Sequence, residues 1–211
     1  MKLYITENWK HLLAGILFLG ATCILGLAGY IFHIYYSPIM GTAPEGSSII
    51  LIPRGSTFNN VTGRVREKGL LPYPRLYDYL AKQMKVHSRI QAGEFKIQHS
   101  WNTSELLQYL VSGKSIRHRI TIPEGSNYEQ IADRLHSAKL ADKEVLMLLI
   151  NDPELLAKTG IPEVTTLEGF LFPETYFFSL VDSEQEILSE MIAQYRRVFN
   201  ADFRSVQKKL E

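Results

Sequence analysis

A five-residue pattern occurs twice in this chain, seventy positions apart. Ile52-Pro53-Arg54-Gly55-Ser56 returns as Ile122-Pro123-Glu124-Gly125-Ser126. The apolar positions that follow also correspond: Phe58, Val61, Val65 and Leu70 in the first copy, and Tyr128, Ile131, Leu135 and Leu140 in the second. This pattern predicts a short strand, a tight Pro-x-Gly turn and an amphipathic helix in each copy. The chain is therefore expected to contain two related units.

The two copies diverge after these helices. We align Gln91-Ala92-Gly93-Glu94-Phe95 of the first copy with Leu167-Glu168-Gly169-Phe170-Leu171 of the second. On this alignment the second copy has Glu168 where the first has Ala92. Because the second copy has a carboxylate beside its glycine where the first has alanine, Glu168 is the first candidate for a reactive residue.

The N-terminal part of the chain contains a long apolar segment. Residues 12–32 include no charged side chain and would span about 30 Å as a helix, the thickness of a hydrocarbon core. Trp9 on one side and tyrosines on the other lie where interfacial aromatic residues belong. We predict a transmembrane helix over residues 12–36, preceded by an N-terminal segment of residues 1–11.

The charges around this segment predict its orientation. Lys2 and Lys10 precede it, whereas no Lys or Arg follows until Arg54. This bias places residues 1–11 in the cytoplasm and the bulk of the chain outside it. The alternative is a cleaved signal peptide, but its apolar region is normally shorter. Cys23 is the only cysteine, so no internal disulfide is expected.

Proline, glycine and capping residues divide the rest of the chain. Residues 37–47 form a predicted linker, residues 48–115 the first unit and residues 116–211 the second. Ser126 with Glu129 has the spacing of a capping box. Further helices are expected at residues 57–68, 76–84, 142–150, from 153, from 183 to 199 and from 202 to 210, with strands at 49–52, 94–97 and 120–122. One more helix is expected to be capped by Asn102 or Thr103 and to stop at Gly113.

Several kinds of site are excluded by composition and spacing. The net charge is +1 with mixed signs along the chain, which gives no footprint for nucleic acid. The six histidines are scattered without a pair at zinc spacing, and neither a phosphate-binding glycine loop nor a Gly-x-Ser-x-Gly turn is present. No metal or cofactor is therefore expected, and carboxylates remain as the candidate reactive groups.

Glu168 is flanked by Leu167 and Phe170 in an aromatic-rich segment that cannot form a regular amphipathic helix. If these neighbours exclude water from the carboxyl group, its pKa rises, as a general acid for a glycosidic oxygen requires. The aromatic side chains could also stack against sugar rings. The alternative interpretation is a turn or capping residue, and the residues alone leave both open.

The run Leu-Glu-Gly-Phe-Leu-Phe-Pro-Glu-Thr-Tyr from Leu167 to Tyr176, with the preceding Ile-Pro-Glu-Gly-Ser and the N-terminal anchor, resembles the endolytic murein transglycosylase (YceG-like) family. The resemblance implies an α+β protein of the cell inner membrane. It implies a transmembrane helix, a LysM-like α/β module over residues 48–115 and a lytic transglycosylase domain over residues 116–211. The implied reaction cleaves MurNAc–GlcNAc bonds of nascent glycan strands, leaves 1,6-anhydro-MurNAc ends and terminates elongation.

The resemblance also implies the site. The catalytic glutamate of the family falls on Glu168, and Phe170, Phe172, Glu174 and Tyr176 are candidate substrate-binding residues. Glu174 could contact the substrate or orient Tyr176, or be structural. The implied partners are peptidoglycan glycan strands and peptidoglycan synthases.

Family members continue beyond the point where this chain ends, so the resemblance implies that the catalytic domain is incomplete. The chain is then a fragment or a natural truncation. The alternative function is that of an inactive homologue that binds peptidoglycan or acts as a scaffold for a synthase.

Overall fold

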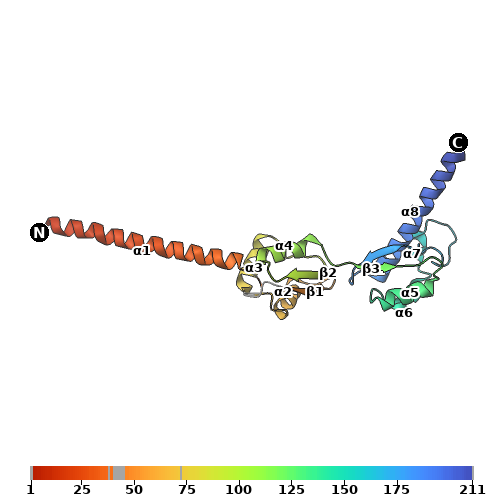
Figure 1. The fold of residues 1–211 in the computed structure, drawn as a ribbon, viewed down its shortest axis with the longest axis horizontal. Helices are drawn as coiled ribbons and strands as arrows, with labels where there is room; N and C mark the ends of the chain where they lie inside the picture. The colour runs from red at the N-terminus through yellow and green to blue at the C-terminus, as the bar shows by residue number, and fades with distance from the viewer. Residues whose placement is uncertain (1, 38, 40–45, 72, 211) are drawn as a thin grey trace. The chain divides into compact units, whose positions relative to one another are not determined.

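A computed structural model describes residues 2–37, 39, 46–71 and 73–210 of the chain. The described residues form helices and two small sheets (Figure 1), which confirms the predicted mixture of α and β structure. Two compact units are present. The first comprises Met1–Ile50, Thr57–Gln91 and Lys96–Gly113, and the second comprises Leu51–Ser56, Ala92–Phe95 and Lys114–Glu211.

The first element is the long helix α1, Lys2–Tyr36. Its part from His11 to Tyr36 is long and apolar enough to cross a membrane, and no side chain of its apolar window is buried in the rest of the protein. The helix predicted over residues 12–36 is therefore present, and its length and composition suit a membrane span.

The elements of the first copy follow α1 in chain order: β1 (Ser47–Ile52), α2 (Phe58–Glu67), α3 (Pro74–Gln83), β2 (Gly93–Gln98) and α4 (Thr103–Ser112). Strands β1 and β2 pair in a two-stranded sheet. The helices bury one apolar stripe each, as their sequence period predicts. Buried side chains of this copy include Ile50, Val61, Val65, Leu70, Tyr77, Leu80, Leu106, Leu107 and Leu110.

The second copy contains β3 (His118–Thr121), α5 (Tyr128–Ser137), α6 (Lys143–Leu149), α7 (Pro153–Lys158), β4 (Thr175–Phe178) and α8 (Glu184–Leu210). Strands β3 and β4 pair antiparallel, with Ile120 opposite Tyr176. One core cluster joins this sheet to the helices. Its members include Ile120, Ile131, Leu135, Leu146, Leu155, Leu167, Tyr176, Phe178, Ile187, Leu188 and Met191.

The strand–turn–helix predicted in both copies is confirmed. Gly55 and Gly125 have φ of +72° and +76°, so the Pro-x-Gly turns use a left-handed conformation that suits glycine. Thr57 caps α2, and Asn127, seventy positions later, caps α5. The first turn of each helix therefore begins at the same place in the repeat.

The two helices also end in the same way. Gly69 after α2 and Lys139 after α5 are both left-handed, with φ of +71° and +58°. Beyond them, the Leu70 N–H donates to the Val65 carbonyl at 3.1 Å and the Leu140 N–H to the Leu135 carbonyl at 3.0 Å. These hydrogen bonds end each helix and return a leucine to the core.

The predicted alignment of Gly93 with Gly169 is wrong. Gly93 begins β2, whereas β4 begins at Thr175, well after Gly169. The second copy has two short helices and a loop between α5 and β4, whereas the first copy has only α3 between α2 and β2. Glu168 therefore lies in a segment that has no counterpart in the first copy.

Two local predictions are also corrected. The capping box of α5 is formed by Asn127 and Gln130, because these side chains reach each other's backbone N–H at 2.8 and 3.0 Å. Ser126 instead donates to the Pro123 carbonyl at 2.8 Å within the turn. The helices expected from residues 183 and 202 form the single helix α8.

We expect Asn127→Ala to lower the free energy of unfolding by about 1 kcal/mol, because it removes the capping hydrogen bond to the Gln130 N–H. Ser126→Ala removes no helix cap and should cost no more than about half as much. Urea denaturation of the full chain in detergent measures both changes. A larger loss for Ser126→Ala would contradict the assignment of the cap.

Candidate active site

Glu168 lies on a tight turn that is held from both ends. The preceding Leu167 is 0% exposed, and its N–H donates to the Ile150 carbonyl at 2.9 Å. The Phe170 N–H donates to the Leu167 carbonyl at 3.0 Å, which closes the turn. Gly169 has φ of +83°, a conformation that favours glycine. The turn thus presents the Glu168 side chain away from the core.

The Glu168 carboxylate contacts the N-terminus of α5. Its Oε2 accepts the N–H of Tyr128, the first residue of that helix, at 3.0 Å. Backbone N–H groups at a helix N-terminus have no partner within the helix, and the helix dipole favours an anion there. A residue forty positions away in sequence therefore supplies the contact that orients this carboxylate.

The sequence left open whether apolar neighbours exclude water from Glu168, and in the structure they do not, because the residue is exposed. Leu167 points into the core cluster. Phe170 packs edge-on against Tyr195 of α8, with ring centroids 5.1 Å apart. The flanking apolar side chains therefore pack against the protein and leave the carboxylate open to solvent.

Phe172 and Tyr176 are linked, since the Tyr176 hydroxyl donates to the Phe172 carbonyl at 2.6 Å. Tyr176 is 5% exposed and stacks on Phe178, and burial raises the pKa of its phenol. Phe172 is half-buried. Tyr176 therefore has the contacts of a core residue that fixes the backbone at Phe172.

Glu174 is exposed, and its Oε1 accepts the N–H of Thr175 at 2.9 Å. Strand β4 then alternates, so that Phe177 points outward and is 56% exposed. Phe177 is the exposed aromatic residue of this strand, and it was not among the predicted site residues. The two-residue period of the strand was the signal that could have identified it.

A groove of about 460 Å³ lies along β4 and α8. Its lining includes Glu174, Tyr176 and Phe177 from the β4 region and Glu190 and Arg197 from α8. Glu168, Phe170 and Phe172 do not line it. The structure therefore groups the predicted site residues at two places, the Glu168 turn and this groove.

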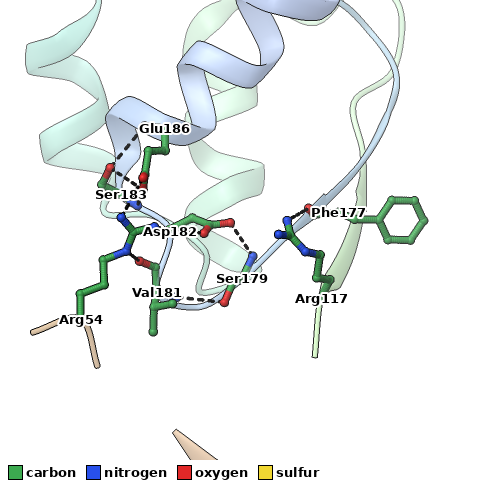
Figure 2. A network of polar contacts seen from close by, with 8 residues as sticks. All are labelled: Arg54, Arg117, Phe177, Ser179, Val181, Asp182, Ser183 and Glu186. Atoms are coloured by element: carbon green, nitrogen blue, oxygen red, sulfur yellow. Dashed lines mark hydrogen bonds and ion pairs between the residues drawn. The ribbon is translucent and has the colours of Figure 1, made fainter. Parts of the chain in front are cut away.

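Arg54 forms a network with the N-terminal end of α8 (Figure 2). Its guanidinium donates to the Val181 carbonyl at 2.6 Å and to the Glu186 carboxylate at 2.7 Å, and it lies 3.5 Å from the Asp182 carboxylate. Asp182 also accepts the Ser179 N–H at 2.7 Å. This network could not be predicted from the sequence, because the partners lie more than 120 positions from Arg54.

His136, Asp142 and Glu144 place three possible metal-ligand atoms within 4.8 Å of one another, although the sequence showed no metal-ligand spacing. All three residues are exposed. Asp142 caps α6 by accepting the Val145 N–H at 3.1 Å, and the His136 Nδ1 accepts the Lys143 N–H at 3.3 Å. These helix-end contacts account for the positions of His136 and Asp142.

The Glu186 carboxyl group should make stability depend on pH. The Ser183 N–H bond and the Arg54 guanidinium hold its pKa below the usual range. A lowered folded-state pKa contributes stability above the unfolded pKa of about 4.3, and this contribution is lost as pH falls through the folded value. We expect Glu186→Gln to flatten the decline in urea midpoint below about pH 4.3.

The control for this measurement is Glu163→Gln, at an exposed loop residue. The urea midpoint of the full chain in detergent is followed as the pH is lowered. An acid decline in Glu186→Gln as steep as in the unmodified protein would show that Glu186 does not contribute to it.

Comparison with known proteins identifies relatives of this chain. The YceG-like family matches residues 50–211. An endolytic murein transglycosylase of Streptococcus pneumoniae (strain D39) is 24% identical over 183 residues, which cover 75% of this chain and 33% of that protein. One from Bacillus subtilis (strain 168) is 26% identical over 160 residues, covering 69% and 44%.

A crystal structure of a YceG-like protein from Listeria monocytogenes aligns with 78% of this chain and 59% of that chain, with 23% identity and a TM-score of 0.38. The chain spans a third of the length of the pneumococcal relative and less than half of the Bacillus relative. Because the family match covers most of its residues, the chain belongs to the YceG-like family.

Proposed function

We propose that this protein is a membrane-anchored endolytic lytic transglycosylase that cleaves MurNAc–GlcNAc bonds in peptidoglycan strands. Membership of the YceG-like family and relatives named endolytic murein transglycosylase support this class of reaction. The observation that carries the proposal is the placement of Glu168. An exposed carboxylate on a turn anchored by buried Leu167, and oriented by the Tyr128 N–H, is both accessible and positioned.

A single carboxyl group is sufficient for this reaction. In the proposed mechanism, Glu168 takes up a proton when the bound glycan excludes water from its carboxyl group, and it gives that proton to the glycosidic oxygen as the bond from MurNAc C1 breaks. The resulting carboxylate then takes the proton of the MurNAc C6 hydroxyl while its oxygen bonds to C1. The products are a 1,6-anhydro-MurNAc end and a free GlcNAc 4-hydroxyl, and Glu168 is protonated again. Most glycosidases, in contrast, require a second carboxylate to activate water or attack the sugar.

The other candidate site residues receive roles that agree with their positions. Glu174 is exposed in the groove along β4 and α8 and can hydrogen-bond to a sugar hydroxyl. Phe170 and Phe172 remain proposed contacts through their partly exposed rings. Tyr176 is proposed as a positioning residue, since its hydroxyl holds the Phe172 carbonyl.

The domain arrangement is part of the proposal. Residues 12–36 would anchor the chain in the cell inner membrane, with residues 1–11 in the cytoplasm and residues 37–47 as a linker. Residues 48–115 would be a LysM-like module that contacts glycan, and residues 116–211 would belong to the catalytic domain. The apolar helix α1 and the lysines before it support the anchor and its orientation. Glycan strands and peptidoglycan synthases are the proposed partners.

A non-catalytic role is the second candidate, as a protein that binds peptidoglycan or holds a synthase. The observation that favours it is the same Glu168 contact, because a carboxylate that accepts the N–H of Tyr128 also fits a helix-capping residue. Activity of the full chain therefore has to be measured directly.

We expect Glu168→Gln to lower the rate of 1,6-anhydro end formation by a factor of about 10² to 10⁴, as loss of a general acid does. The amide oxygen can still accept the Tyr128 N–H, so the fold should be retained. The measurement incubates the full chain in detergent with purified glycan strands and detects anhydro ends by mass spectrometry. Glu163→Gln, at an exposed residue of the same loop, should keep the unmodified rate.

Anhydro ends formed at the normal rate by Glu168→Gln would exclude Glu168 as the acid. If the unmodified chain forms no product but sediments with the glycan, the binding role replaces the catalytic one. Circular dichroism of both variants shows whether a loss of rate reflects chemistry or unfolding.

A further inference from the structure

A second groove lies between the apolar helix α1 and the start of helix α3, both within the first compact unit. It has a volume of about 610 Å³ and is predominantly apolar. The lining residues are Tyr30 and Ile34 of α1 together with Tyr73, Pro74, Arg75 and Leu76 at the start of α3. The proposed glycan site at Glu168 belongs to the other unit, so this groove needs a separate explanation.

The position of the groove along α1 determines its depth in a bilayer. Tyr30 and Ile34 both lie within His11–Tyr36, the part of α1 that can cross a membrane. At about 1.5 Å per residue, Tyr30 lies only about 9 Å from the end of that segment at Tyr36. Residues of α3 that line the same groove therefore lie at the depth of the last two turns of α1. In a bilayer this is the headgroup and upper acyl-chain layer.

Helix α3 has the composition of an interfacial helix on its outward side. Its inward side buries Tyr77, Leu80 and Ala81 in the first unit. Its outward side carries Leu76 and Tyr79, the latter 58% exposed, with Arg75 one turn before Tyr79. Apolar and aromatic side chains combined with a cation are what a helix in the headgroup layer presents.

We propose that the first two turns of α3 lie in the headgroup layer of the membrane and that a phospholipid occupies the groove. The acyl chain would contact Tyr30, Ile34 and Leu76, and the exposed Arg75 guanidinium would bind the lipid phosphate. The inference rests on the proposed membrane anchoring of α1. Its consequence is that the first unit rests on the bilayer surface and is not suspended from it by a free linker.

A phospholipid is the proposed occupant because two residues of α1 line the groove. The groove shares Tyr30 and Ile34 with the surface of α1 that would contact lipid, so whatever surrounds α1 also reaches the groove. Arg75 then supplies charge complementarity to the phosphates found at this depth. A protein partner would have to displace lipid from both helices to reach the same residues.

The test measures the depth of α3 in the full chain. Cys23, the only cysteine, is first replaced by alanine (Cys23→Ala). In this background the Leu76→Cys variant is labelled at its new thiol with the fluorophore NBD. A second labelled variant, Tyr79→Cys, uses an already exposed position in case labelling at Leu76 disturbs packing. The matched control is Asn59→Cys, at an exposed position on α2. Each protein is reconstituted into phosphatidylethanolamine and phosphatidylglycerol vesicles with or without a nitroxide near the top of the acyl chain.

We expect quenching at residues 76 and 79 to exceed that at residue 59 by about twofold or more. Arg75→Glu should lower the quenching toward the control value, whereas Arg75→Lys should retain it, because only the reversal repels the phosphate. Equal effects of both substitutions would overturn the assignment of Arg75 to a phosphate.

Flotation of the same samples separates this inference from the anchoring on which it rests. If the chain floats with the vesicles but residues 76 and 79 are quenched no more than residue 59, α3 lies outside the bilayer and the inference is wrong, while the anchor stands. If the chain does not float with vesicles, the proposed anchoring fails and the inference fails with it.

Discussion

Burial of Leu167 is the interaction on which the candidate site depends. This side chain lies in the core cluster that joins β3, β4 and the helices of the second copy, and its N–H is held by the Ile150 carbonyl. Glu168 is the next residue in the chain. Gly169 has a left-handed conformation that turns the chain at this point, so the Glu168 side chain points out of the core. The exposed carboxylate is thus positioned by the burial of Leu167 and not by burial of its own side chain. The residue that stabilises the turn is therefore different from the residue proposed to react.

The duplication shows how one structural pattern can serve two purposes. Both copies use a Pro-x-Gly turn, a polar N-cap and a left-handed helix end at matching positions. The turn residue of the first copy, Arg54, pairs with the start of α8, whereas its counterpart Glu124 is simply exposed. Between helix and second strand, only the second copy has two helices and the Glu168 loop. The proposed reactive group therefore lies in a segment that only the second copy has, and not within the shared elements.

The proposed reaction and the proposed membrane contact involve different physical requirements. Acid catalysis needs a carboxyl group that meets the substrate, and the open turn at Glu168 provides access. An interfacial helix needs apolar and cationic side chains at one depth, which α3 presents next to the end of α1. Because these features lie in different units, each can be changed by substitution without altering the other.

The sequence alone determined the features that depend on neighbouring residues: the apolar helix, the amphipathic helices, the two Pro-x-Gly turns and the family motif around Glu168. These features are encoded within a few positions, by period and by local hydrogen bonds. Only the tertiary structure decided that Glu168 is exposed and bound to the Tyr128 N–H, that Gly169 does not begin a strand, and that Arg54 pairs with α8. Such contacts join residues far apart in sequence, so they depend on how whole elements pack and not on any local pattern.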